Sequence, residues 1–296
     1  MKQKVIAIVG QTASGKSALS VKMAKKIGGE IISCDSRQIY IGLNIGTGKI
    51  TKEEMGSIPH HLLDIANPKR VFTVAQYKKE AKKKIDEISK RKKIPIICGG
   101  TGFYLSALID NILLPLVPPN KALRKNLNTK TAIELFHILK KKDPNRARTI
   151  DPYNKVRLTR AIEIAHSLGH VPPLKKENPY DVLTLGIKIP DEKLKKNIKK
   201  RLLLRIKKGM IKEAIELHKE GLSFKRMREL GLEYKYLAEF LEKKMGKEEM
   251  IEKLEKAIWQ YAKRQKTWFK KDTRIIWTGP KKSKTLNATL KRFLEK

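Results

Sequence analysis

The stretch Gly10-Gln11-Thr12-Ala13-Ser14-Gly15-Lys16-Ser17 decides the fold of this chain. It has the pattern G-x-x-x-x-G-K-[ST] of a phosphate-binding loop, between an apolar, strand-like run at residues 5–9 and a helix-like segment that continues to Ile27. Two glycines let the backbone wrap a diphosphate so that successive N–H groups point at it from the start of the following helix. A chance glycine-rich turn is the alternative, and the flanking strand and helix argue against it.

The last two residues of the stretch add the chemistry that a phosphate site needs. Lys16 supplies a mobile positive charge, and Ser17 at the helix start can offer its hydroxyl to a Mg²⁺ ion that bridges phosphate oxygens. We therefore expect a diphosphate or triphosphate to be bound by Gly10, Gln11, Thr12, Ala13, Ser14, Gly15, Lys16 and Ser17. The pattern leaves open which of the two binds, and whether phosphate is transferred or released.

The composition points to a folded protein with a polyanionic partner. The 296 residues suffice for one large or two modest domains, and the 40% hydrophobic content can form a core. Lys and Arg number 67 against 30 Asp and Glu, a net charge of +37 that is spread along the chain. A domain this basic repels itself unless it binds a polyanion, and nucleic acid is the first candidate. A lysine-rich proteome or thermal adaptation is the alternative, although Glu would then be expected to rise with Lys.

The two cysteines and the hydrophobic runs indicate the compartment. Cys34 and Cys98 each end an apolar run, and neither lies in a metal-binding or redox spacing. We expect both to be buried, reduced thiols. No apolar run approaches the length of a membrane span, and the chain begins with a strand instead of a signal peptide. The expectation is a cytoplasmic protein that does not enter the membrane.

A carboxylate follows the second expected strand, residues 30–34. Open parallel sheets bind ligands at the carboxyl ends of their strands, so Asp35 is expected to face the same site as the phosphate loop. The competing interpretation is that Asp35 or Ser36 caps a helix over residues 38–43. The residues alone do not decide between these two roles.

Two further strands complete this half of the sheet. We expect a short third strand at 61–65, whose Asp64 is better explained by a turn than by a metal site. The fourth strand, 94–98, runs into Gly99-Gly100-Thr101-Gly102, where the backbone can approach a ligand and Thr101 is the candidate polar contact.

The remaining chain is mainly helical and basic. Helices are expected near 121–126, 132–141 and 154–168, then a fifth strand at 182–189 in the same sheet, further helices over 191–271 with breaks at four glycines, a last strand at 274–277 and a last helix at 285–294. The predicted fold class is α/β, a P-loop NTPase-like parallel sheet core with inserted α-helical regions. The predicted divisions are a core of 1–114, 180–190 and 273–296, a helical insertion of 115–179, and a helical substrate-binding region of 191–272.

A segment near the end of the second helical region, residues 258–271, interleaves aromatic and cationic side chains. Arg and Lys can contact phosphates, and Trp and Tyr offer faces on which unpaired bases stack. An ordinary amphipathic helix with Ile258, Tyr261, Ala262 and Trp268 in the core is the other interpretation, and opposite faces of one helix can do both.

Taken together, these motifs resemble one family. They are Gly10 to Ser17, Ser33-Cys34-Asp35-Ser36-Arg37-Gln38-Ile39-Tyr40, Asn44-Ile45-Gly46-Thr47-Gly48-Lys49, Pro59-His60-His61-Leu62-Leu63-Asp64, Gly99-Gly100-Thr101-Gly102-Phe103-Tyr104, and Lys263-Arg264-Gln265-Lys266-Thr267-Trp268-Phe269. In this order they are similar to the bacterial tRNA dimethylallyltransferases, and the resemblance extends from Val5 to about Trp277.

The resemblance implies a specific reaction. The phosphate loop would hold dimethylallyl diphosphate with Mg²⁺, not ATP, and the acceptor would be N6 of the adenosine 3′-adjacent to the anticodon in tRNAs that read codons beginning with U. The products would be N6-dimethylallyladenosine and diphosphate. The partners would be tRNA, through its anticodon stem-loop, and the donor, with no membrane, and we expect a monomer.

The resemblance also assigns residue roles. Asp35 matches the general base that takes a proton from the amine, Thr101 the residue beside the bridging oxygen of the diphosphate, and Arg201 the diphosphate-binding arginine. The positions that match tRNA contacts are Asp35, Ser36, Arg37, Gln38, Thr101, Arg124, Arg157, Arg160, Lys263, Arg264 and Gln265. Where relatives often carry Gly-Tyr-Arg/Lys-Gln, this chain has Gly231-Leu232-Glu233-Tyr234, so that segment's contacts with the anticodon loop are not carried over.

Two other classes share part of the pattern. A P-loop nucleotide or small-molecule kinase would have the loop and the acid after the second strand, but would not need the basic, Trp-bearing segment. A non-catalytic RNA-binding or regulatory NTPase would need neither Asp35 nor Thr101 in position.

Overall fold

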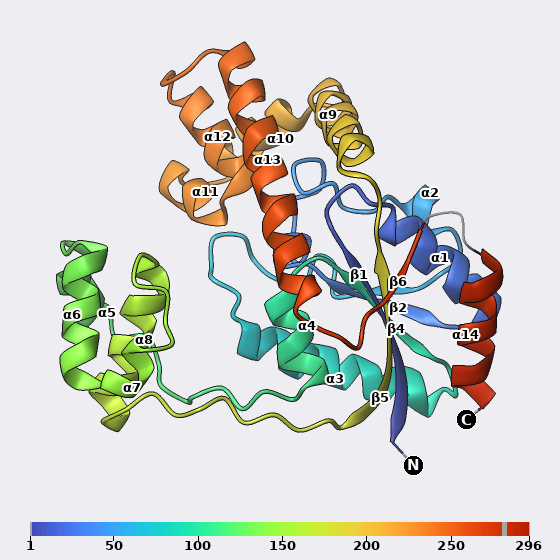
Figure 1. The fold of residues 1–296 in the computed structure, drawn as a ribbon. Coiled ribbons are helices and arrows are strands. Elements are labelled where there is room, and N and C mark those ends of the chain that lie inside the picture. The colour runs from blue at the N-terminus through green and yellow to red at the C-terminus, as the bar shows by residue number, and fades with distance from the viewer. Residues whose placement is uncertain (1, 280–282, 296) are drawn as a thin grey trace. The chain divides into compact units, whose positions relative to one another are not determined.

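The computed structural model describes residues 2–279 and 283–295, and it divides into two compact units (Figure 1). One unit consists of Met1–Asn111 and Asn178–Lys296, and the other of Ile112–Glu177. The predicted helical insertion at 115–179 falls almost entirely in the second unit. The predicted substrate-binding region at 191–272 falls in the same unit as the sheet.

The first unit is built on a parallel sheet. Its strands are β1 (Gln3–Gly10), β2 (Glu30–Cys34), β3 (His60–His61), β4 (Pro95–Gly99), β5 (Tyr180–Ile187) and β6 (Ile276–Thr278). Their spatial order is β3-β2-β4-β1-β5-β6, and every pairing is parallel. The predicted α/β fold class is confirmed, with the strand before the phosphate loop in the middle of the sheet.

Burial on both faces explains the continuous apolar runs in these strands. Residues 5–9 of β1 are all at most 1% exposed, as expected for a parallel strand covered by helices on both sides. The helices α1 (Lys16–Ile27), α3 (Val74–Lys90), α4 (Gly102–Ile109) and α14 (Ser283–Glu295) follow or flank the strands. In α3, Tyr77, Ala81, Ile85 and Ile88 are buried, and Lys79, Lys82 and Lys83 are exposed, so its basic face is solvated.

Two local interpretations of the sequence were wrong for identifiable reasons. The helix over 38–43 that Asp35 or Ser36 would cap is absent, because Tyr40 forms a parallel bridge with Ala66. The third strand stops at His61, since Leu62 and Asp64 have positive φ angles of 62° and 54° that end an extended strand. The loop of residues 44–59 contains a short helix, α2 (Lys52–Met55), which a capping box at Thr51 stabilises.

The second helical region packs into the same core as the sheet. It contains α9 (Asp191–Lys207), α10 (Met210–Lys219), α11 (Phe224–Leu230), α12 (Leu232–Leu241) and α13 (Lys247–Lys270). The four predicted glycine breaks fall between these helices. Leu194, Leu254 and Phe269 belong to the same buried cluster as the strand residues, so α9 and α13 are part of the first unit's core.

The second unit is a small helical body. It consists of α5 (Lys121–Asn128), α6 (Ala132–Lys142), α7 (Pro144–Ala147) and α8 (Lys155–Leu168). It has a core of its own around Leu135, Leu139 and Leu158, each 0% exposed. The short α7 was not expected from the sequence; a proline starts it after Asp143, whose carboxylate accepts the N–H of Arg146.

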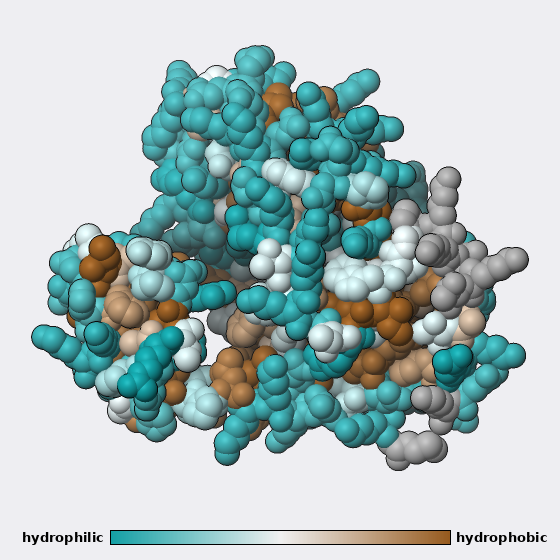
Figure 2. Space-filling model, viewed as in Figure 1, coloured by the Kyte–Doolittle hydropathy of each residue, from teal (hydrophilic) through white to brown (hydrophobic). Residues whose placement is uncertain are grey.

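One face of the molecule is largely hydrophilic. Figure 2 shows polar and charged side chains over most of the face that it presents, including helices α10 to α13. Within residues 2–279 and 283–295, no helix combines the length and the apolar character that crossing a membrane requires.

Candidate functional site

The strand register brings three sequence motifs to one edge of the sheet. Val9 of β1 and Cys34 of β2 both lie opposite Gly99 of β4, so these three strands end at the same level. The phosphate loop, Asp35 and Thr101 therefore leave the sheet side by side at its carboxyl edge, where parallel sheets bind ligands.

The phosphate loop has the backbone shape that its sequence predicts. Gly10, Ala13 and Gly15 have φ angles of 143°, 59° and 95°, and the start of α1 has no side-chain cap. The first N–H groups of α1 thus remain available to an anion. The hydroxyl of Ser14 is buried and has no hydrogen-bond partner in the described part of the chain. A phosphate oxygen would satisfy it, so this loop fits a diphosphate.

Lys16 lies among other charged groups of the site. Its Nζ donates a hydrogen bond to the carbonyl of Gln11 at 2.6 Å. Burial, with a smaller contribution from the charge of Arg201, lowers the pKa of Lys16 to about 8, although Cys98 and Asp35 act to raise it. The two cations lie close enough to repel, a cost that a bound dianion would offset.

Helix α9 approaches the phosphate loop through two residues one turn apart. Asn197 donates its side-chain N–H to the carbonyl of Ala13 at 3.2 Å. Arg201 follows on the same face of the helix. Burial and the charge of Arg205 lower the pKa of Arg201. The structure thus brings together Lys16 and Arg201, which lie far apart in the sequence.

The Asp35 carboxylate shapes a turn instead of capping a helix, and its place at the sheet edge fits the site role that the sequence predicts for it. Its Oδ1 accepts the N–H groups of Arg37 at 2.8 Å and Gln38 at 3.3 Å, which forms a turn. Among the described residues, its Oδ2 accepts no hydrogen bond. Next to it, the hydroxyl oxygen of Thr101 accepts the N–H of Ser36 at 3.1 Å, which leaves the Thr101 hydroxyl hydrogen available as a donor. One carboxylate oxygen therefore shapes the turn, and the other can accept a proton.

Tyr261 of α13 is a further neighbour of this pair. Burial and the negative charge of Asp35 raise the pKa of Tyr261, while Arg37 and the Thr101 side chain lower it. The sequence left two roles open for Tyr261, a stacking face for an unpaired base and a core position of an amphipathic helix. Its helical spacing gave no signal that it borders the site.

Gln265 ties α13 to the phosphate loop. Its Oε1 accepts the N–H of Thr12 at 2.7 Å, and its Nε2 donates to the carbonyl of Gly100 at 3.0 Å. The side chain is buried, and Gln11 adds a bond to the carbonyl of Ala262 at 3.2 Å. Gln265 thus holds α13 on the phosphate loop, and its predicted tRNA contact stays a prediction.

The glycines after β4 lie against side chains of helix α13. A side chain at Gly100 would lie 2.1 Å from Nε2 of Gln265, and one at Gly102 would lie 2.2 Å from the ring of Trp268. The packing of α13 therefore requires glycine at both positions, and the expected approach of a ligand to this backbone stays a prediction.

The predicted tRNA-binding cations occupy different environments. Lys263 and Arg264 are exposed on α13, and each lies 5.9 Å from an aromatic ring, Trp259 and Tyr261 respectively. Arg37 is half-buried and donates to the carbonyl of Ser36 at 3.4 Å.

In the second unit, a buried carboxylate holds two of the predicted cations. Arg124 binds both oxygens of Glu163, at 2.7 and 2.8 Å, and Arg160 binds the same carboxylate at 3.4 Å. Arg157 is exposed. Arg124 and Arg160 thus stabilise their own helices, and about a third or more of each side chain remains accessible to an RNA phosphate, 42% and 34%.

The segment that departs from the family pattern has clear partners. Glu233 pairs with Arg205 at 2.9 Å, and the buried hydroxyl of Tyr234 donates to Glu213 at 2.7 Å. Glu213 was missed by the sequence analysis, since a glutamate on an amphipathic helix has no distinguishing pattern.

The described residues hold no cluster of three or more His, Cys, Asp or Glu side chains that could bind a metal by themselves. The exposed hydroxyl of Ser17 stands at the start of α1 beside the phosphate loop. Mg²⁺ prefers oxygen ligands and commonly completes its shell with substrate phosphates and water. This donor set fits a magnesium ion that arrives with a diphosphate.

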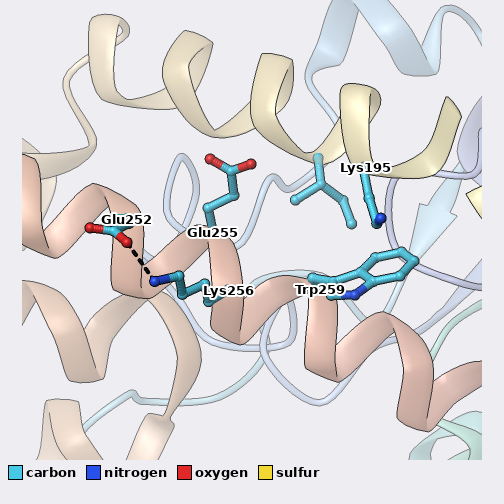
Figure 3. A pocket seen from close by; sticks show the side chains of 6 residues that line it. Lys195, Glu252, Glu255, Lys256 and Trp259 are labelled. Carbon is cyan, nitrogen blue, oxygen red and sulfur yellow. Dashed lines mark hydrogen bonds and ion pairs between the residues drawn. The ribbon is translucent and has the colours of Figure 1, made fainter. Parts of the chain in front are cut away.

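A separate groove lies between α9 and α13 (Figure 3), with a volume of about 260 Å³. Its lining residues are Lys195, Ile198, Glu252, Glu255, Lys256 and Trp259. Lys195 lies 5.3 Å from the Trp259 ring, and Lys256 pairs with Glu252 at 2.5 Å. None of the predicted site residues lines this groove, and its own ion pairs occupy most of its charged groups.

Comparisons with known proteins agree with one another. The model of the IPP transferase family matches residues 38–272. The tRNA dimethylallyltransferase 2 of Treponema denticola is 44% identical over 91% of this chain and 92% of its own length. The tRNA dimethylallyltransferase of Syntrophomonas wolfei is 40% identical over 93% of this chain and 91% of its own.

Two solved structures of tRNA-modifying transferases are also similar to this chain. The tRNA isopentenylpyrophosphate transferase of Bacillus halodurans matches with a TM-score of 0.76 and 34% identity, covering 99% of this chain and 97% of that protein. A eukaryotic dimethylallyltransferase acting on tRNA matches with a TM-score of 0.81 and 26% identity, covering 98% of this chain and 77% of that protein.

Proposed function

Because the chain belongs to the IPP transferase family, we propose that it transfers the dimethylallyl group of dimethylallyl diphosphate to N6 of the adenosine 3′-adjacent to the anticodon, in tRNAs that read codons beginning with U. The chain is a prenyltransferase that modifies tRNA, as its relatives are. The donor, the modified base and the residue roles are the parts proposed here. The alternative of a nucleotide or small-molecule kinase is not favoured.

One observation carries the residue roles: an oxygen of Asp35 with no hydrogen bond lies at the same sheet edge as the neighbouring cations Lys16 and Arg201. The reaction needs both kinds of group. Negative charge grows on the departing diphosphate, where cations and N–H groups can stabilise it. The attacking adenine amine is a poor nucleophile, which a carboxylate within hydrogen-bond reach can assist.

The proposed reaction is a substitution at the allylic carbon of the donor. The N6 nitrogen forms a bond to the allylic carbon while the bond from that carbon to the bridging diphosphate oxygen breaks. Asp35 takes the proton that N6 loses, through Oδ2, and Thr101 donates its hydroxyl hydrogen toward the bridging oxygen. Lys16 and Arg201 hold the diphosphate that leaves.

We propose Mg²⁺ as the cofactor, with Ser17 as the protein ligand. When bound, the ion would neutralise diphosphate charge beside the loop. The structural support is the oxygen donor at the start of α1, next to the buried and unpartnered Ser14 hydroxyl.

The tRNA must present its base unstacked. Adenine N6 is reached most easily in a single-stranded loop, where bases can be splayed out and stacked on aromatic side chains. We propose that Lys263 and Arg264 contact the RNA backbone, with Arg157, Arg124 and Arg160 as contacts from the second unit. A monomeric, cytoplasmic enzyme stays a prediction.

The deciding experiment supplies unmodified tRNA and Mg²⁺ with either carbon-labelled dimethylallyl diphosphate or γ-labelled ATP. We expect label on RNA from the prenyl donor alone, on the adenosine that follows the anticodon, because the allylic diphosphate carries its own leaving group. The label should be lost in Asp35→Asn. Labelling of a small molecule from ATP without prenyl transfer would overturn the proposal.

A further inference from the structure

The Glu213 carboxylate on α10 gathers an unusual number of hydrogen bonds. It accepts the backbone N–H groups of Asn44 at 3.0 Å, Ile45 at 2.7 Å and Gly46 at 2.8 Å. It also accepts the hydroxyl hydrogen of Tyr234 at 2.7 Å. Successive N–H groups that converge on one anion form a nest, so a single side chain fixes the first half of the loop 44–48.

Tyr234 and Arg205 also contact this loop, at Gly46. Tyr234 is 1% exposed, and a side chain at Gly46 would lie 2.7 Å from its hydroxyl, so only glycine fits there. Burial and the Glu213 charge raise the pKa of Tyr234 far above its ordinary value, which keeps the hydroxyl a donor. Arg205 donates to the carbonyl of Gly46 at 2.6 Å.

The other end of the loop contacts the proposed catalytic arginine. Gly48 has a φ angle of 60°, and a side chain there would lie 2.7 Å from Nη2 of Arg201. Gln38 also donates to the Gly48 carbonyl at 3.3 Å, which joins the loop to the segment after Asp35. The loop therefore limits where the Arg201 guanidinium can lie, while Asn197 holds the preceding turn of the same helix on the phosphate loop.

We propose that Glu213, with Tyr234, is a positioning residue for prenyl transfer: it holds the loop 44–48, and the loop holds the Arg201 guanidinium beside the phosphate loop. This inference rests on the proposed function. A cation that is already in place when charge develops on the leaving group stabilises the transition state without a cost of reorganisation. Glu213 itself does not touch the substrate.

The test compares Glu213→Gln with Glu216→Gln, an exposed glutamate on the same helix whose pairing with Lys212 spans 3.8 Å. The amide of Gln turns an N–H group toward backbone donors, so the loop is released while side-chain volume is kept. We expect kcat to fall roughly 10- to 100-fold in Glu213→Gln, less than the loss expected from removing a transition-state donor outright. The affinity for tRNA should stay within about twofold, and Glu216→Gln should behave as wild type.

A double-mutant cycle with Arg201→Ala distinguishes positioning from a general loss of stability. If Glu213 acts through Arg201, Glu213→Gln should cause little further loss of kcat in the Arg201→Ala background. Losses that multiply, or a normal kcat with a lower melting temperature, would overturn the inference. If Glu213→Gln does not fold, Tyr234→Phe keeps the three N–H bonds and should show a smaller kcat loss with the same lack of additivity. An absence of prenyl transfer by the wild-type protein would count against the proposed function instead.

Discussion

At the scale of single residues, the charge of Lys16 sets a pH limit on donor binding. Burial lowers its pKa from 10.5 to about 8, so above that pH the free protein carries a neutral amine. A diphosphate needs the charged form and raises the pKa again when it binds. We expect the affinity for dimethylallyl diphosphate to be constant below pH 8 and to fall roughly tenfold per pH unit above it.

Calorimetric titration of the donor between pH 6.5 and 9.5 would measure this fall, and the dependence on buffer ionisation enthalpy would reveal the proton taken up. Lys16→Arg is the matched control, because a guanidinium stays charged across this range. Its donor affinity should be weaker and independent of pH. An affinity that does not change with pH in the wild type would show that Lys16 is not the group that meets the diphosphate.

The two oxygens of Asp35 allow its structural and chemical roles to be separated. In Asp35→Asn the side-chain oxygen can still accept the N–H groups of Arg37 and Gln38, while the amide cannot take a proton. Turnover should fall by roughly 10²–10⁴, the usual span for a lost general base, with donor and tRNA affinities within a few-fold of wild type.

Asp35→Ala removes the turn as well and should add a loss of thermal stability and of tRNA affinity. Single-turnover kinetics would measure turnover, a melting curve would measure thermal stability, and a binding titration would measure the tRNA affinity. If Asp35→Asn keeps normal turnover while its affinity drops, the carboxylate is only a turn former.

At the scale of elements, helix α13 supports the phosphate loop through one side chain. Gln265→Ala would leave the buried carbonyl of Gly100 without a partner, at a cost of about 1–3 kcal/mol, and would also remove the acceptor of the part-buried N–H of Thr12. The loop should then hold the diphosphate less rigidly. We expect a several-fold higher donor KM and a lower melting temperature.

Thr267→Ala on the same helix is the control, since its exposed hydroxyl bonds only to the carbonyl of Lys263 within the helix. It should match the wild type in both measurements. A Gln265→Ala protein with unchanged donor KM and reduced tRNA affinity would favour the predicted role of Gln265 as an RNA contact.

How much the sequence predicted depends on whether the signal was local. The phosphate loop, its flanking strand and the helix breaks at glycines are short-range patterns, and the structure has them where they were expected. The predicted length of the third strand was wrong, because an apolar run in the sequence does not indicate that Leu62 and Asp64 have positive φ angles. Gln265 and Glu213 owe their roles to partners about 165 to 250 residues away in the chain, which no spacing rule reveals.

At the scale of the whole molecule, the protein has two compact units and a net charge of +37. The second unit has its own core, and its buried Glu163 on α8 pairs with Arg124 of α5 and with Arg160 on α8 itself. Acidic residues number fewer than half of the basic ones, so ion pairs within the protein cannot neutralise its net charge of +37. RNA binding by this protein should depend steeply on salt, because each phosphate contact releases a counterion.

The exposed cations of α13 give this expectation a specific test. Replacing Lys263 and Arg264 by Ala removes two charges that lie beside the aromatic rings of Trp259 and Tyr261. If both contact phosphates, the slope of log affinity for tRNA against log salt should fall by between about 1.4 and 1.8 units, at roughly 0.7 to 0.9 per contact. Filter-binding assays between 50 and 300 mM KCl would measure the slope.

The control removes the same charge elsewhere: Lys82 and Lys83 are exposed on α3, on the face that the structure shows to be solvated. Lys82→Ala with Lys83→Ala should lower affinity only slightly through the weaker overall field, and should keep the slope of the wild type, because no counterion is released from a lysine that meets no phosphate. Equal slopes for the two double variants would mean that α13 contributes charge without contact. The donor affinity serves as the internal reference, since neither pair of residues belongs to the phosphate loop, and it should be unchanged in both.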